Sequence, residues 1–159
     1  MKQQITDSLI ESKNSLIKRV LIMLKRKVKV GVIGCGGIAY RRTIPGMMLC
    51  ENAELVAVME INMELAEKCR AKWNCKKAYD TEADLLADPE IVAVSVCTPN
   101  KAHSFITIDC LKAGKNVLCE KPLTVNAAEA EELSSIAKMY DKNDESVSFD
   151  KALIEKFDK

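Results

Sequence analysis

The sequence lacks the features that mark membrane-spanning, secreted and metal-binding proteins. Its longest uninterrupted apolar run near the N-terminus is Val20 to Leu24, whereas a membrane span needs roughly 20 residues. No secretory signal pattern is visible. The seven cysteines are odd in number and include no C-x-x-C pair, so we expect reduced thiols, with no disulfide and no metal site. These absences predict a cytoplasmic location and no membrane partner.

Net charge is also nearly absent. The 159 residues carry a formal charge of +1, so no bulk electrostatic field draws the chain to nucleic acid, and we expect no nucleic-acid partner. The charge is unevenly distributed, because residues 1–29 hold eight Lys or Arg against two acids, while residues 30–140 hold twelve against fifteen. The basic excess therefore belongs to an N-terminal arm outside the central part of the chain.

Residues 1–26 form that arm, and we predict a helical extension there. The apolar residues Ile5, Leu9, Leu16, Val20 and Leu24 recur at helical spacing, with Ser, Lys and Arg between them. One interpretation is a basic helix that binds a membrane surface or a partner. The other, which we favour, is an extension that packs its apolar stripe on the domain or on another copy of it.

Residues 27–140 alternate between strand and helix patterns. Predicted strands cover 28–33, 53–60, 76–79, 91–99 and 116–120, and predicted helices cover 37–48, 62–74, 81–88, 101–113 and 125–140. Pro45 is expected to bend or shorten the first of these helices. This alternation predicts an α/β fold with a Rossmann-type doubly wound parallel sheet in three layers. After Tyr140 the pattern ends, and residues 141–159 are predicted to be a polar C-terminal tail.

A glycine-rich stretch, GCGGIA at 34–39, joins the first predicted strand to the first predicted helix. It fits G-x-G-x-x-G/A, which in this context is typical of dinucleotide binding. Gly34 permits a tight turn, and Gly36 has no side chain to hold the backbone away from a pyrophosphate. The N–H groups that open the helix, at Gly36, Gly37 and Ile38, can bind phosphate oxygens. A glycine-rich connection without a ligand is the weaker alternative.

Glu60 ends the second predicted strand, 26 positions after Gly34. An acid at this place in the architecture binds the adenosine ribose hydroxyls. Its carboxylate would repel a ribose phosphate, so we expect NAD rather than NADP. Arg41 and Arg42 leave an alternative open, since a nearby arginine can accept that phosphate. The simpler interpretation is that both arginines are solvated or contact the pyrophosphate.

Two more segments follow predicted strands at the edge where doubly wound sheets bind ligands. In CTPNKAH, at 97–103, Thr98 and Asn100 offer hydrogen bonds and Pro99 stiffens the turn. His103 opens the next helix, although a lone histidine is more often structural. In CEKPL, at 119–123, Lys121 comes to the same edge. Taken alone, a solvated Lys-Pro turn is the more ordinary interpretation, because a lysine of pKa about 10.4 is a poor base.

Four segments, GVIGCGGIA, ELVAVME, DLLADPEIVAVSVCTPNKAH and AGKNVLCEKPLT, occur between about Val28 and Tyr140. In this order and spacing they resemble the Gfo/Idh/MocA-type NAD(P)-dependent oxidoreductases. The resemblance implies reversible hydride transfer between nicotinamide and a hydroxyl-bearing carbon of a sugar, cyclitol or related compound. It implies that Lys121 is the catalytic residue. It also places residues around the nicotinamide in the predicted cofactor site: Cys97, Thr98, Pro99, Asn100, His103, Glu120 and Lys121.

The family continues into a larger substrate domain, and residues 141–159 do not resemble it. We therefore expect a truncated or otherwise incomplete enzyme in which residues 27–140 are the NAD(P)-binding domain. The alternative is a non-catalytic NAD-binding or regulatory module. In either case we expect a homo-oligomer, since a sheet without its covering domain leaves apolar surface that association hides.

Overall fold

Five parallel strands form one sheet within residues 27–140, the part of the chain that the computed structural model describes. The predicted extension (1–26) and tail (141–159) lie outside these residues. The sheet order is β3-β2-β1-β4-β5. The strands are β1 (Val28–Ile33), β2 (Ala53–Met59), β3 (Lys77–Tyr79), β4 (Ala93–Val96) and β5 (Asn116–Cys119).

Strand β4 is shorter than the predicted 91–99. Its apolar run begins in a turn, where the N–H of Ile91 donates to the carbonyl of Asp88, and only Ala93–Val96 form the paired strand. Within the strand, Val94, Ser95 and Val96 are all buried. This is the behaviour of a central parallel strand covered on both faces.

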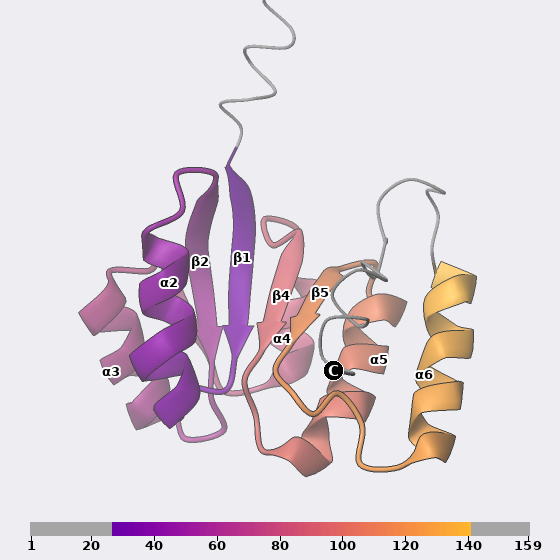
Figure 1. Cartoon of the computed structure of the whole chain (residues 1–159). Coiled ribbons are helices and arrows are strands. Elements are labelled where there is room, and N and C mark those ends of the chain that lie inside the picture. The colour runs from indigo at the N-terminus through magenta and orange to yellow at the C-terminus, as the bar shows by residue number, and fades with distance from the viewer. Residues whose placement is uncertain (1–26, 141–159) are drawn as a thin grey trace, which may run out of the picture.

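Helices cover both faces of the sheet, which gives the predicted three layers (Figure 1). Core contacts place the first two helices on one face and the next two on the other, as right-handed crossovers require when the chain changes direction at β1. The last helix packs against α5. The helices are α2 (Ile44–Met48), α3 (Met63–Trp73), α4 (Glu82–Ala87), α5 (His103–Lys112) and α6 (Ala127–Tyr140).

Pro45, predicted to bend or shorten the first helix, does not end it early but follows a widened helical turn. A π-helical segment, Ala39–Thr43, precedes α2, and the N–H of Ile44 donates to the carbonyl of Ala39 five residues earlier. Proline has no N–H to donate to the preceding turn. The π geometry shifts the hydrogen-bond pattern so that the chain remains helical up to Met48.

The core has two parts, one on each face of the sheet. A bulge in β2 determines on which face each side chain of that strand packs. Val30 pairs with Leu55 and Gly31 with Ala57, so Val56 is the extra residue. As a result Leu55 and Val58 pack on the α2 and α3 face, whereas Val56 and Ala57 pack on the opposite face. All of these β2 side chains are apolar, so alternation could not reveal the bulge.

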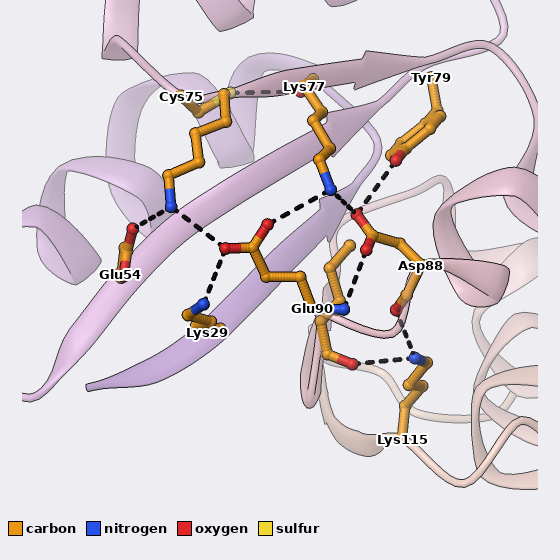
Figure 2. Close-up of polar contacts among 10 residues, drawn as sticks. Lys29, Glu54, Cys75, Lys77, Tyr79, Asp88, Glu90 and Lys115 are labelled. Atoms are coloured by element: carbon orange, nitrogen blue, oxygen red, sulfur yellow. Dashed lines mark hydrogen bonds and ion pairs between the residues drawn. The ribbon is translucent and has the colours of Figure 1, made fainter. Parts of the chain in front are cut away.

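A network of ion pairs holds the amino-terminal ends of the strands together (Figure 2). Asp88, at the end of α4, accepts hydrogen bonds from Lys77 Nζ (2.7 Å) and Tyr79 Oη (3.0 Å). Burial raises the pKa of Asp88, but these bonds and one from the N–H of Glu90 outweigh burial, so its pKa lies below the ordinary value.

Glu90 extends this network. Hydrogen bonds from three lysines, Lys29, Lys76 and Lys77, lower its pKa to about 2. Because the pKa values of both carboxyls are lowered, their contribution to stability is present at neutral pH. It is lost as the pH falls from the ordinary glutamate value of 4.5 toward 2.

We predict that Asp88→Asn lowers the free energy of unfolding by about 1 kcal/mol, because the partly buried charge-assisted bond from Lys77 is weakened. Urea unfolding followed by circular dichroism at pH 7 measures this change. Glu64→Gln is the matched control, since it removes the exposed pair with Lys68 and should leave the midpoint unchanged. Equal midpoints for Asp88→Asn and the unsubstituted chain would contradict the prediction.

Candidate dinucleotide-binding site

The predicted site residues gather at one edge of the sheet. All five strands are parallel, so their carboxyl ends meet at a single edge, marked by the arrowheads in Figure 1. The glycine-rich loop follows β1, Glu60 follows β2, Cys97 to Asn100 follow β4, and Glu120 and Lys121 follow β5. This is the edge at which doubly wound sheets bind ligands.

Gly34 is required by the fold itself. Its φ of +93° lies in the left-handed region, which L side chains rarely adopt. A Cβ on Gly34 would lie 2.9 Å from the backbone carbonyl carbon and oxygen of Cys97. The N–H of Gly34 donates to the carbonyl of Met59 at 2.8 Å. The loop after β1 is thus held close to the ends of both neighbouring strands.

Gly36 and Gly37 are exposed and have different surroundings. A Cβ on Gly36 would meet no atom within 4 Å, whereas one on Gly37 would lie 2.9 Å from Nη2 of Arg41. The Arg41 guanidinium therefore lies over the loop. Helix formation begins here, so the first N–H groups, Ile38 included, have no preceding turn to bond to. The loop offers an open backbone surface with donors and a cation beside it.

Glu60 is tied to the same loop. Its Oε2 accepts a hydrogen bond from the N–H of Cys35 at 3.0 Å, and its own N–H donates to the carbonyl of Tyr79 at 3.1 Å. A hydrogen bond with Cys69 and burial raise the pKa of the Cys35 thiol, so this thiol is neutral at pH 7. Glu60 is thus the negative charge next to the loop backbone at Cys35.

The segment after β4 supplies one unsatisfied polar atom. Oγ1 of Thr98 is buried and has no hydrogen-bond partner among the described residues. Native proteins rarely leave a buried polar atom without such a partner. Cys97 is buried, and burial raises the pKa of its thiol. It therefore contributes backbone to this edge. Pro99 and Asn100 are exposed at the start of the next turn.

His103 is buried and contacts two loops through its ring nitrogens. The side chain is 1% exposed. Its Nε2 lies 2.7 Å from the carbonyl of Thr98, and its Nδ1 lies 2.7 Å from the carbonyl of Pro122. A neutral ring can donate to only one of these carbonyls, and a protonated ring can donate to both. The structure therefore gives His103 backbone partners on both sides and no exposed ring nitrogen.

Glu120 and Lys121 lie on the loop after β5. Oε1 of Glu120 accepts a hydrogen bond from Thr43 Oγ1 at 2.9 Å, across 77 positions of sequence. The side chain of Lys121 is exposed at the same edge, and the Lys121–Pro122 bond is cis. The sequence did not indicate Thr43 as a contact of Glu120, because no local pattern links residues so far apart in the chain.

Residues 27–140 contain neither a metal-binding cluster nor a membrane-spanning helix. No group of three or more His, Cys, Asp or Glu side chains in this range could hold a metal ion. No helix in the same range is long and apolar enough to cross a membrane.

Comparison with known proteins agrees with this geometry. Residues 28–147 match the Gfo/Idh/MocA model, described as an oxidoreductase family with an NAD-binding Rossmann fold. An uncharacterized oxidoreductase of Rhizobium meliloti is 37% identical over 115 residues, covering 72% of this chain and 34% of the relative. The myo-inositol 2-dehydrogenase of Thermotoga maritima is 32% identical over 114 residues, with the same shares.

A solved structure is similar to this chain in sequence and in fold. The 3-ketoreductase KijD10 of Actinomadura kijaniata, in complex with TDP-benzene and NADP, is 31% identical, with a TM-score of 0.69. The match covers 72% of this chain and 36% of KijD10. The chain thus spans about a third of the length of these relatives. The family match, the fold and the glycine-rich loop agree, and the chain belongs to the Gfo/Idh/MocA oxidoreductase family.

Proposed function

We propose that this chain binds NAD at the carboxyl edge of its sheet, as the dinucleotide-binding domain of an oxidoreductase. The observation that carries the proposal is the open surface over Gly36, bordered by a glutamate that is hydrogen-bonded to the same loop. When bound, NAD supplies the hydride acceptor. The chain's own residues would bind and orient it, and we propose that Lys121 acts on the substrate.

The residues at this edge fit such a cofactor in three ways. The backbone at Gly36 can approach a pyrophosphate, because nothing fills the space above it. The Arg41 guanidinium beside Gly37 can neutralise phosphate charge. The unpaired Oγ1 of Thr98 can gain a hydrogen-bond partner. Pro99 and Asn100 extend the same exposed turn toward the nicotinamide side, and His103 keeps that turn in register with the Lys121 loop.

We propose NAD rather than NADP. Glu60 lies at the end of β2, where a carboxylate accepts hydrogen bonds from ribose hydroxyls and repels a ribose phosphate. Arg41 and Arg42 are the residues that could reverse this preference. The Arg41 guanidinium lies beside Gly37 in the glycine-rich loop, and Arg42 is exposed in the next turn. The related KijD10 structure holds NADP, so cofactor preference is a property to be measured for this chain.

Glu60→Ala tests that preference. We expect the unsubstituted chain to bind NADH more tightly than NADPH, and the variant to narrow the difference, because the repulsive carboxylate is gone. Titration followed by nicotinamide fluorescence measures both affinities. Glu64→Gln, on the exposed surface of α3, should leave both unchanged. Equal affinities for the two cofactors in the unsubstituted chain would reject the NAD assignment.

Gly36→Val tests the pyrophosphate surface. The fold has room for the new side chain, so the variant should keep its circular dichroism spectrum while losing NADH binding by at least about a hundredfold, as a phosphate contact is blocked. Gly46→Ala is the control, since its Cβ also meets no atom within 4 Å. It lies in α2, away from the loop. Unchanged NADH affinity in Gly36→Val would place the cofactor elsewhere.

We propose Lys121 as the catalytic residue toward a hydroxyl-bearing carbon of a sugar-like or cyclitol-like substrate. Support comes from its exposed position at the carboxyl edge and from relatives named as an inositol dehydrogenase and a dTDP-sugar 3-reductase. Proton transfer from a hydroxyl needs a positioned base. His103 is the only histidine of the sequence, and both its ring nitrogens face backbone carbonyls.

The purified chain should therefore bind NADH without appreciable reduction of NAD⁺ across a panel of sugars and cyclitols. Absorbance at the nicotinamide band measures turnover, and fluorescence titration of the same samples measures NADH binding. This outcome fits an incomplete catalytic centre as well as a non-catalytic NAD-binding module. Robust reduction that disappears in Lys121→Ala would contradict the expectation and establish the lysine's role directly.

We also propose that the chain is cytoplasmic and homo-oligomeric. All seven cysteines are free, as is usual in a reducing compartment. Among residues 27–140, β5 pairs on one side only, with β4. Val125 and Met139, among the residues that follow β5, are exposed. Unpaired apolar edges favour association. Light scattering should give the mass of a dimer or larger species, and a monomer at high concentration would contradict this.

A further inference from the structure

An apolar groove lies on the sheet face that carries α2. Its volume is about 380 Å³. The floor comes from β1, β4 and β5, and one wall comes from α2 and the turn after it. Its lining is almost entirely apolar and includes Val28, Val30, Met47, Ala53, Ala93 and Leu118. The groove is separate from the cofactor loop, since none of Gly34, Gly36, Glu60 or Lys121 lines it.

Topology explains why this part of the sheet has no helix over it. Crossovers from β1 to β2 and β3 run in one direction and place α2 and α3 on this face. The return to β4 and the step to β5 run in the opposite direction, so right-handed crossovers place α4 and α5 on the other face. The α2 face over β4 and β5 is therefore left open among the described residues.

We propose that residues 16–24 of the same chain fill this groove as an amphipathic helix. Three residues, 25–27, separate Leu24 from Val28, and Val28 lines the groove. A connection of that length is ordinary between a helix and a strand. It also keeps the segment at high effective concentration beside the groove, which favours its own chain over a second copy.

The segment matches the groove in pattern and in length. On a helix, Leu16, Val20 and Leu24 share one face, while Lys18 lies on the opposite face. Lys13 shares the face of Leu16 but precedes it, so the uninterrupted apolar stripe runs from Leu16 to Leu24. Nine helical residues extend about 14 Å, close to the about 13 Å of the four-residue strands β4 and β5. The apolar stripe can therefore lie along this part of the floor.

The C-terminal residues are a weaker occupant. They follow Tyr140 at the end of α6, and α6 packs against α5, which covers the opposite face of the sheet. A chain leaving α6 has to pass the β5 edge before it reaches the groove. Residues 16–24, by contrast, are separated from the first strand of the groove floor by only the three residues 25–27.

Photo-crosslinking in the full-length chain tests the proposal. Val20 is replaced by the photoreactive residue p-benzoylphenylalanine, and the matched control carries it at Lys18. After irradiation, we expect position 20 to crosslink within one chain to peptides containing Met47 or Leu118, several-fold more than position 18. Mass spectrometry of the monomer band identifies the sites. Leu118→Asp should strongly reduce this crosslink, whereas Leu49→Asp, exposed and outside the lining, should not.

Each other outcome overturns the proposal. Crosslinks that join two chains assign the groove to a second copy. Equal yields from positions 20 and 18, or no crosslink from position 20, show that this stripe does not occupy the groove. Persistence of the crosslink in Leu118→Asp places the segment elsewhere. Titration of NADH in the same samples keeps the result distinct from the proposed function, because the groove and the cofactor loop share none of the site residues.

Discussion

The close approach of the Gly34 backbone to the end of β4 is the constraint on which the site depends. A side chain at Gly34 would meet the carbonyl group of Cys97 at 2.9 Å in a left-handed conformation. If the loop moved away, its backbone could not bond both Met59 and Glu60. The position of Gly36, the approach of the glutamate and the turn at Thr98 all follow from this one contact between backbones.

The two edges of the sheet satisfy their polar groups differently. At the amino-terminal edge, Asp88 and Glu90 are fully engaged with lysines and backbone donors, so this edge contributes stability. At the carboxyl edge, Thr98 keeps an unpaired hydroxyl and the space over Gly36 is open. Parallel strands bring the turns that follow them to one edge, and the ion pairs at the other edge can stabilise the sheet without obstructing those turns.

His103 illustrates how the family's sequence motif and its geometry differ. As a residue type it suggests proton transfer, yet the structure buries it between two backbone carbonyls. It joins the turn after β4 to the loop that carries Lys121. A residue of this kind acts by holding two loops in register, so the exposed lysine and the exposed turn are presented together at the sheet edge.

The sequence by itself determined the strands, the helices, the three-layer order and the places of the glycines, Glu60 and Lys121. These depend on local patterns: apolar periodicity, caps such as Asn62, and glycine and proline between elements. Tertiary structure alone decided the bulge at Val56, the bond from Thr43 to Glu120, the partners of His103 and the open groove. Each of these joins residues from different strands or helices, and pairing across the sheet leaves no trace in local periodicity.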